Sequence, residues 1–144
     1  MKIDKIEEYK DELKELSKKS ILLKKCYEHL GAMILIEQNQ DYFFDCSFFC
    51  YNYQQLLEKL MKHCIEINIG DYFRGHKLKK LLELLIQNSD FRVDKSKYNP
   101  YLLYITSCAE NYRYDEEIDC EAFRESFLIT KELLNELIKY AKEK

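Results

Sequence analysis

The sequence predicts an all-α protein, a bundle of four principal helices with short extra helices. Hydrophobic residues recur at steps of three and four positions through most of the chain, which is the spacing of one helix face. Only three glycines and one proline interrupt the 144 residues, so the chain has few turns and its elements are long. Leu, Lys, Glu and Ile dominate the remaining composition and favour amphipathic helices.

The first two elements are predicted from this periodicity. A segment from about Ile3 to Leu16 has apolar residues at helical spacing with many charged residues between them, so we expect a peripheral helix. A second helix is predicted from about Ser20 to Glu37. Its inward-facing residues are Leu22, Leu23, Cys26, Leu30, Met33 and Ile34. Asn39 or Asp41 is placed to cap the helix that follows.

The third predicted helix, from about Asp41 to Ile67, carries the clearest apolar stripe. The stripe consists of Cys46, Phe49, Cys50, Tyr53, Leu56, Leu57, Leu60, Met61 and Cys64. At 100° per residue, Phe44, Phe48 and Tyr51 fall on the opposite face of the same helix. Because that face must also be buried, either another helix or a second subunit covers it, and we predict a homodimer through these three rings.

The later elements follow from turn residues and caps. Asn68 to Gly75 is predicted as a loop, and Lys77 to Ile86 as a short helix. A polar connection is expected to end at Asn99-Pro100, where the proline suits the first position of a short helix through Cys108. After a charged, tyrosine-rich stretch, Asp119 is placed to cap a final helix that runs to about Tyr140.

Charge and length limit the class of protein. The 23 basic and 26 acidic residues are interspersed, and the net charge of −3 argues against a general nucleic-acid coating protein but leaves room for a local basic patch. The N-terminus lacks an apolar signal core, and no stretch reaches the roughly 20 apolar residues of a membrane-spanning helix. We therefore expect one cytoplasmic domain over residues 1–144, with no membrane contact.

The six cysteines are expected to be reduced thiols on apolar helix faces, because the chain shows no secretion signal. None of them forms a C-x-x-C motif, and the three histidines do not stand at zinc-ligand spacing with them. We predict neither a metal site nor a bound cofactor.

Four short motifs in the middle and end of the chain resemble those of the HEPN family, named for nucleotide binding in higher eukaryotes and prokaryotes. The first is Gln55-x-x-Glu58-Lys59-x-x-Lys62, which is similar to the family's Q-x-x-E-K-x-x-K helix. Asp41-Tyr42-Phe43 resembles the acidic-aromatic lead-in to that helix. Gly75-His76-Lys77-Leu78 resembles its loop histidine, and Asn111-Tyr112-Arg113-Tyr114 its arginine-tyrosine turn. The resemblance covers about Ala32 to Ala141 and leaves the N-terminal helix outside.

The resemblance implies an up-and-down bundle of four or five helices, often dimeric, that acts as a nucleotide- or RNA-associated module. Many bacterial members are encoded beside a minimal nucleotidyltransferase, and some members are metal-independent ribonucleases with an R-x4-6-H motif. That motif is absent here: Arg74 is the only arginine that precedes a histidine, and one residue separates it from His76. Lys24 and His29 have the spacing, but lysine lacks the planar fork that grips phosphate.

A candidate phosphate site follows from an antiparallel arrangement of these helices. The end of the Asp41 helix, the start of the Lys77 helix and the turn before the last helix would then lie at one end of the bundle. The residues that would converge there are Glu58, Lys59, Lys62, Arg74, His76, Lys77, Arg113 and Tyr114. The cations would bind phosphates and the tyrosine would stack on a base or ribose.

Structural roles explain several of the same residues. Glu58 and Lys62 are spaced as a solvated surface pair within one helix. His76 is placed to cap or pack at a helix start, and Arg113 to pair with Glu110 or Asp115.

Three functions are compatible with the sequence. The leading hypothesis is a HEPN-like binding module that acts with a partner protein such as a nucleotidyltransferase. The second is a ribonuclease of the toxin–antitoxin type with an altered site, in which His76 is the general acid or base and Arg74 or Arg113 stabilises the phosphate. The third is a structural dimerisation subunit without a site.

Overall fold

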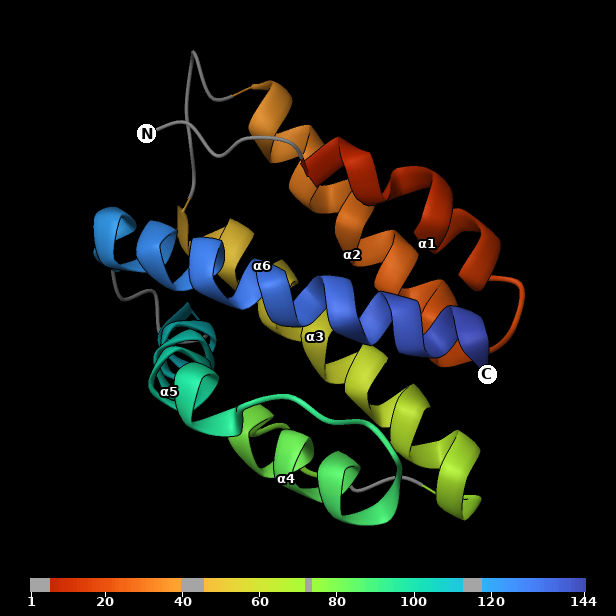
Figure 1. Cartoon of the computed structure of the whole chain (residues 1–144). Helices are drawn as coiled ribbons and strands as arrows, with labels where there is room; N and C mark the ends of the chain where they lie inside the picture. The colour runs from red at the N-terminus through yellow and green to blue at the C-terminus, as the bar shows by residue number, and fades with distance from the viewer. Residues whose placement is uncertain (1–5, 40–45, 72–73, 113–117) are drawn as a thin grey trace.

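The structure, a computed structural model, describes residues 6–39, 46–71, 74–112 and 118–144 (Figure 1). These residues form a short 3₁₀ helix and six α-helices, and no strand occurs among them. The helices are η1 (Ile6–Tyr9), α1 (Lys10–Leu16), α2 (Ile21–Gln38), α3 (Cys46–Ile69), α4 (Leu78–Asn88), α5 (Lys95–Tyr112) and α6 (Cys120–Glu143). The predicted all-α bundle is confirmed.

The central element is α3, which contacts α2, α4, α5 and α6 (Figure 1). Sixteen of its 24 residues are buried, including polar ones. α3 is therefore enclosed on more than the single face that its apolar stripe predicts.

Aromatic rings fill the space between α3 and α6. Phe49 and Tyr53 pack edge-on against Phe127, with ring centroids 5.7 and 4.8 Å apart. Phe123 packs against both α3 rings from one turn earlier in α6. The Tyr53 hydroxyl lies 2.8 Å from Thr130 Oγ1, so the one polar atom of this seam has a partner.

The two helices run in parallel, because residues near the start of α3 contact the start of α6 and Asn68 contacts Tyr140 near its end. Cys46 and Cys120 are the first residues of α3 and α6, and they form a disulfide across 74 positions. The expectation that all six cysteines are reduced is therefore wrong for these two. Periodicity placed Cys46 correctly on the inner face, but it carries no information on a partner so distant in sequence.

Caps explain where the outer helices begin. The Ser20 hydroxyl accepts from Leu23 N at the start of α2, and Asp119 Oδ1 accepts from two amides at the start of α6, as predicted for Asp119. The proposed cap role of Asn39 at the next helix is wrong, because Asn39 ends α2 and donates to the Leu35 carbonyl. Asp41 lies outside the described residues.

α5 begins at Lys95, five residues before Pro100, the predicted first position. Asp94 Oδ1 accepts from Ser96 N, and the helix runs from Lys95 through Pro100. The polar residues 95–99 are thus helical, because an aspartate cap initiates this helix. Pro100 lies past the first turn, so the helix lacks one backbone hydrogen bond there.

The residues that lead directly into α4 lie beside the middle of α3. Asn68, near the end of α3, bonds to Tyr140, whereas the backbone of His76 lies beside Gln54. Fourteen residues of helix separate Gln54 from Asn68, which is about 21 Å. The start of α4 and the end of α3 are therefore far apart, and the expectation that they share one end of the bundle is wrong.

The second aromatic patch of α3 is covered within the same chain. Tyr112, in the last turn of α5, packs against Phe48 and Tyr51 with ring centroids 5.8 and 5.0 Å away. Of the two covers that the sequence allows, a helix of the same chain is present, because α5 extends far enough to reach these rings, and the homodimer stays a prediction. All three rings stay partly exposed, and Phe44 lies outside the described residues.

The N-terminal helices pack more closely than their charge indicates. Leu13 and Leu16 are buried, and α1 contacts α2 and α6. None of the described helices has the length and apolar character that crossing a membrane requires.

Candidate functional site

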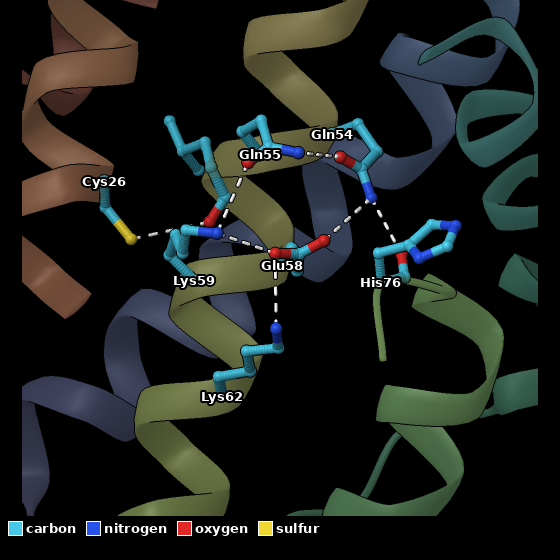
Figure 2. A network of polar contacts seen from close by, with 8 residues as sticks. Cys26, Gln54, Gln55, Glu58, Lys59, Lys62 and His76 are labelled. Atoms are coloured by element: carbon cyan, nitrogen blue, oxygen red, sulfur yellow. Dashed lines mark hydrogen bonds and ion pairs between the residues drawn. The ribbon is translucent and has the colours of Figure 1, made fainter. Parts of the chain in front are cut away.

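A row of polar side chains on α3 forms the most unusual feature of the structure (Figure 2). Glu58 is 3% exposed and stands at the centre of the row. Its Oε2 lies 2.7 Å from Lys59 Nζ and 3.4 Å from Lys62 Nζ. One buried carboxylate therefore holds two ammonium groups, and the expected solvated surface pair of Glu58 and Lys62 is in fact inside the protein.

Two glutamines extend the row toward α4. Gln55 donates to Gln54 Oε1 at 2.7 Å, and Lys59 Nζ also donates to Gln55 Oε1. Gln54 Nε2 donates to Glu58 Oε1 at 3.4 Å and to the backbone oxygen of His76 at 2.8 Å. Gln54 thus joins the carboxylate on α3 to the segment that leads into α4.

The charge state of Glu58 follows from these contacts. Burial alone raises the pKa of the Glu58 carboxyl, but the hydrogen bond from Lys59, the charges of Lys59 and Lys62 and the bond from Gln54 together lower it below its ordinary value. The carboxylate is therefore ionised at neutral pH, and it offsets one of the two lysine charges.

His76 lies at the edge of this network. Its imidazole Nε2 is 3.0 Å from Glu110 Oε1 in α5, and both side chains are nearly half exposed, at 44% and 43%. Arg74 and Lys77 flank His76 and are exposed. α4 begins at Leu78, one residue after the predicted start at Lys77, and the Leu78 amide bonds to Thr106 Oγ1.

The structure describes six of the eight predicted site residues. Glu58, Lys59 and Lys62 lie on α3, and Arg74, His76 and Lys77 lie on the segment whose backbone bonds to Gln54. These two groups adjoin the middle of α3 and not an end of the bundle. Arg113 and Tyr114 lie outside the described residues, and Glu110, one of the predicted partners of Arg113, contacts His76.

The other two histidines have separate structural partners. His29 Nδ1 lies 2.9 Å from Asn52 Oδ1, which links α2 to α3. His63 Nδ1 lies 2.9 Å from the Ser20 hydroxyl, and burial together with the charge of Lys19 lowers the pKa of His63. No group of three or more potential metal ligands occurs in the described part of the chain.

Sequence reasoning missed Gln54 and Glu110 as members of the site. Gln54 precedes the Q-x-x-E-K-x-x-K motif and falls on the same helix face as Glu58, four residues later, which was an available signal. No signal in the sequence indicated Glu110, because its position opposite His76 depends on the packing of α5 against α4.

These features define a class of protein: a helical bundle whose central helix carries a buried polar row made from the residues of one short motif. A family model described as the HEPN domain matches residues 32–143, more than half of the chain. The chain belongs to the HEPN domain family. Neither the curated proteins nor the solved structures gave a match.

Proposed function

We propose that this chain is a nucleotide- or RNA-associated binding module that contacts phosphates where the polar row of α3 meets residues 74–77. One observation carries the proposal: Gln54 Nε2 bonds both to Glu58 and to the backbone of His76. This bridge ties the segment that carries Arg74 and Lys77 to the side of α3 that carries the family motif. Membership of the HEPN family supports the nucleotide or RNA class of ligand.

Burial divides the cations into two groups. Lys62 is 7% exposed and serves to balance Glu58, so we assign it a supporting role. Lys59 keeps 17% of its side chain exposed, and Arg74 and Lys77 are exposed. Arg74 and Lys77 are the main proposed phosphate contacts, because exposed cations bind phosphate without losing a buried partner. Lys59 adds the exposed part of its side chain while it stays paired with Glu58. Arg113 and Tyr114 stay in the proposed site on the strength of the sequence.

The first test removes the two exposed cations beside His76. In Arg74→Ala/Lys77→Ala we expect an unchanged melting temperature, because exposed side chains contribute little to stability. Binding of a short single-stranded RNA or a nucleoside triphosphate should weaken, measured by fluorescence anisotropy over a range of salt. For single-stranded RNA, the slope of log affinity against log salt should fall by about 0.7 per lost phosphate contact.

The matched control is Lys10→Ala/Lys14→Ala, which removes two exposed charges from α1. It should leave both affinity and salt slope unchanged. Equal weakening in the two double variants would show that binding depends on overall charge and would reject the site.

The pairing of His76 with Glu110 favours a second function, the ribonuclease alternative. A carboxylate that orients an imidazole is a common arrangement for general acid or base catalysis. In that case the wild type cleaves RNA without added metal, His76→Ala abolishes cleavage and Glu110→Gln reduces it, while circular dichroism shows an unchanged fold. Binding without cleavage leaves the binding module as the function.

We further propose that the chain acts as a homodimer and with a partner protein such as a minimal nucleotidyltransferase. The half-buried rings of Phe48, Tyr51 and Tyr112 supply an apolar contact surface for a second copy. Sedimentation should give a dimer that Tyr51→Glu dissociates. A dimer that binds neither nucleotide nor RNA would support the third function, that of a structural dimerisation subunit without a site.

A further inference from the structure

The four cysteines near the start of α3 and α6 differ sharply from the other two. Cys46 and Cys120 are bonded, Cys50 follows Cys46 by one helical turn, and Cys50 Sγ donates to the Ile105 carbonyl of α5, one turn before Cys108. Cys26 and Cys64 lie elsewhere in the core, where burial raises the pKa of Cys64 to about 12. The chain therefore gathers four of its six cysteines at one end of the bundle.

The two cysteines of the Cys46–Cys120 bond differ in burial. Cys46 is 5% exposed, whereas Cys120 is only partly buried at the start of α6. The four free cysteines are all buried. Cys120 is therefore the least buried cysteine of the described residues, and we take it as the one that a thiol from solution meets first.

Both sulfurs also belong to residues that begin a helix. The backbone amides and the dipole at a helix start stabilise a thiolate and so favour the reduced form of the pair. The two ends are not equal, because the Asp119 carboxylate caps α6 beside Cys120 and opposes a second negative charge there. By this asymmetry Cys46 is the better leaving group and Cys120 is the sulfur to attack.

We propose that the Cys46–Cys120 bond is a reversible thiol–disulfide exchange site for small thiols such as glutathione, attacked at Cys120. The thiolate of the small molecule forms a bond to Cys120 Sγ, and the S–S bond breaks to release Cys46 as a thiolate. A second small thiolate attacks the sulfur of the small molecule in the mixed disulfide and releases Cys120. In total, two small thiols are oxidised to one disulfide, and their two protons end on the two cysteines.

The experiment counts free thiols in the intact chain after equilibration in buffers of reduced and oxidised glutathione. Trapping with a maleimide under denaturing conditions, followed by mass spectrometry, should give four labels in oxidising buffer and six in reducing buffer. The transition should be reversible and should occur at millimolar glutathione. A chain that keeps four labels in millimolar reduced glutathione carries a permanent structural bond, and this result would overturn the proposal.

The wild-type chain tests the direction of attack. After brief treatment with reduced glutathione and quenching in acid, peptide mass mapping should find glutathione on Cys120 and a free thiol at Cys46. Cys64→Ala, in which a buried thiol is removed elsewhere on α3, should keep the wild-type transition with one label fewer, and circular dichroism confirms that this variant is folded. Glutathione found on Cys46 in place of Cys120 would contradict the assigned direction.

Discussion

Two faces of α3 are buried by different chemistry. The face toward α6 is an apolar seam, in which Phe49 and Tyr53 meet the rings of α6. The face that carries Gln55, Glu58 and Lys62 is almost as inaccessible, yet every one of these side chains is polar. Burial along one helix therefore does not follow its hydrophobic pattern alone.

The difference lies in how each face tolerates change. The apolar seam is stabilised by removal of surface from water, which is non-directional and tolerates small shifts. The polar row is stable only while its charges and hydrogen bonds stay paired, because a buried charge without a partner is costly. Because such a buried polar arrangement is costly, we expect it to be kept where it serves function or conformational specificity.

The largest effect is expected on the apolar seam. Phe127→Ala removes a ring that is 1% exposed and should lower the free energy of unfolding by about 4 kcal/mol. Chemical denaturation monitored by circular dichroism measures it. The adjacent Leu128→Ala is the control, because Leu128 is 52% exposed and its loss should cost less than about 0.5 kcal/mol. Similar costs for the two variants would place Phe127 outside the core.

The polar row should respond nearly as strongly, and in a pH-dependent manner. Glu58→Gln keeps the shape but removes the charge shared by Lys59 and Lys62, so we expect a loss of about 3 kcal/mol at neutral pH. Because the folded pKa of Glu58 lies below its ordinary value of 4.5, this stabilisation is complete above pH 4.5 and is lost as the pH falls through the folded pKa. The difference in free energy of unfolding between the wild type and Glu58→Gln should therefore become smaller in acid.

The control for this variant is Glu66→Gln on the exposed end of α3. It should change stability little and leave the acid dependence intact. A constant gap between wild type and Glu58→Gln from pH 7 to pH 3 would contradict an ionised, paired Glu58.

The fold could be predicted further than the site. Helical periodicity and the Asp119 cap were sufficient for α2, α3 and α6, because these depend on local sequence. The disulfide and the placement of residues 74–77 beside the middle of α3 were not predictable, since both depend on contacts between residues far apart in the chain. At the site, the motif identified Glu58 and its lysines, but only packing shows that they are buried and that His76 faces Glu110.

The smallest expected effect is at the single polar contact inside the apolar seam, where the two partners are not equivalent. Thr130 Oγ1 donates its proton to the Ser126 carbonyl at 2.7 Å, so the Tyr53 hydroxyl must be the donor in the bond between Tyr53 and Thr130. Tyr53→Phe removes a donor and leaves Thr130 bonded to the backbone, which should cost less than about 1 kcal/mol.

Thr130→Val instead leaves the fully buried Tyr53 hydroxyl without its acceptor and should cost about 2 kcal/mol. Denaturation of the two variants and of the double variant measures the asymmetry. The double variant lacks both the Tyr53 hydroxyl and the Thr130 hydroxyl, so no polar group is left unpaired there. Its stability should therefore lie close to that of Tyr53→Phe. If Thr130→Val is the milder substitution, the hydroxyl of Tyr53 has another acceptor, and the apolar seam would then resemble the polar row in depending on a wider network.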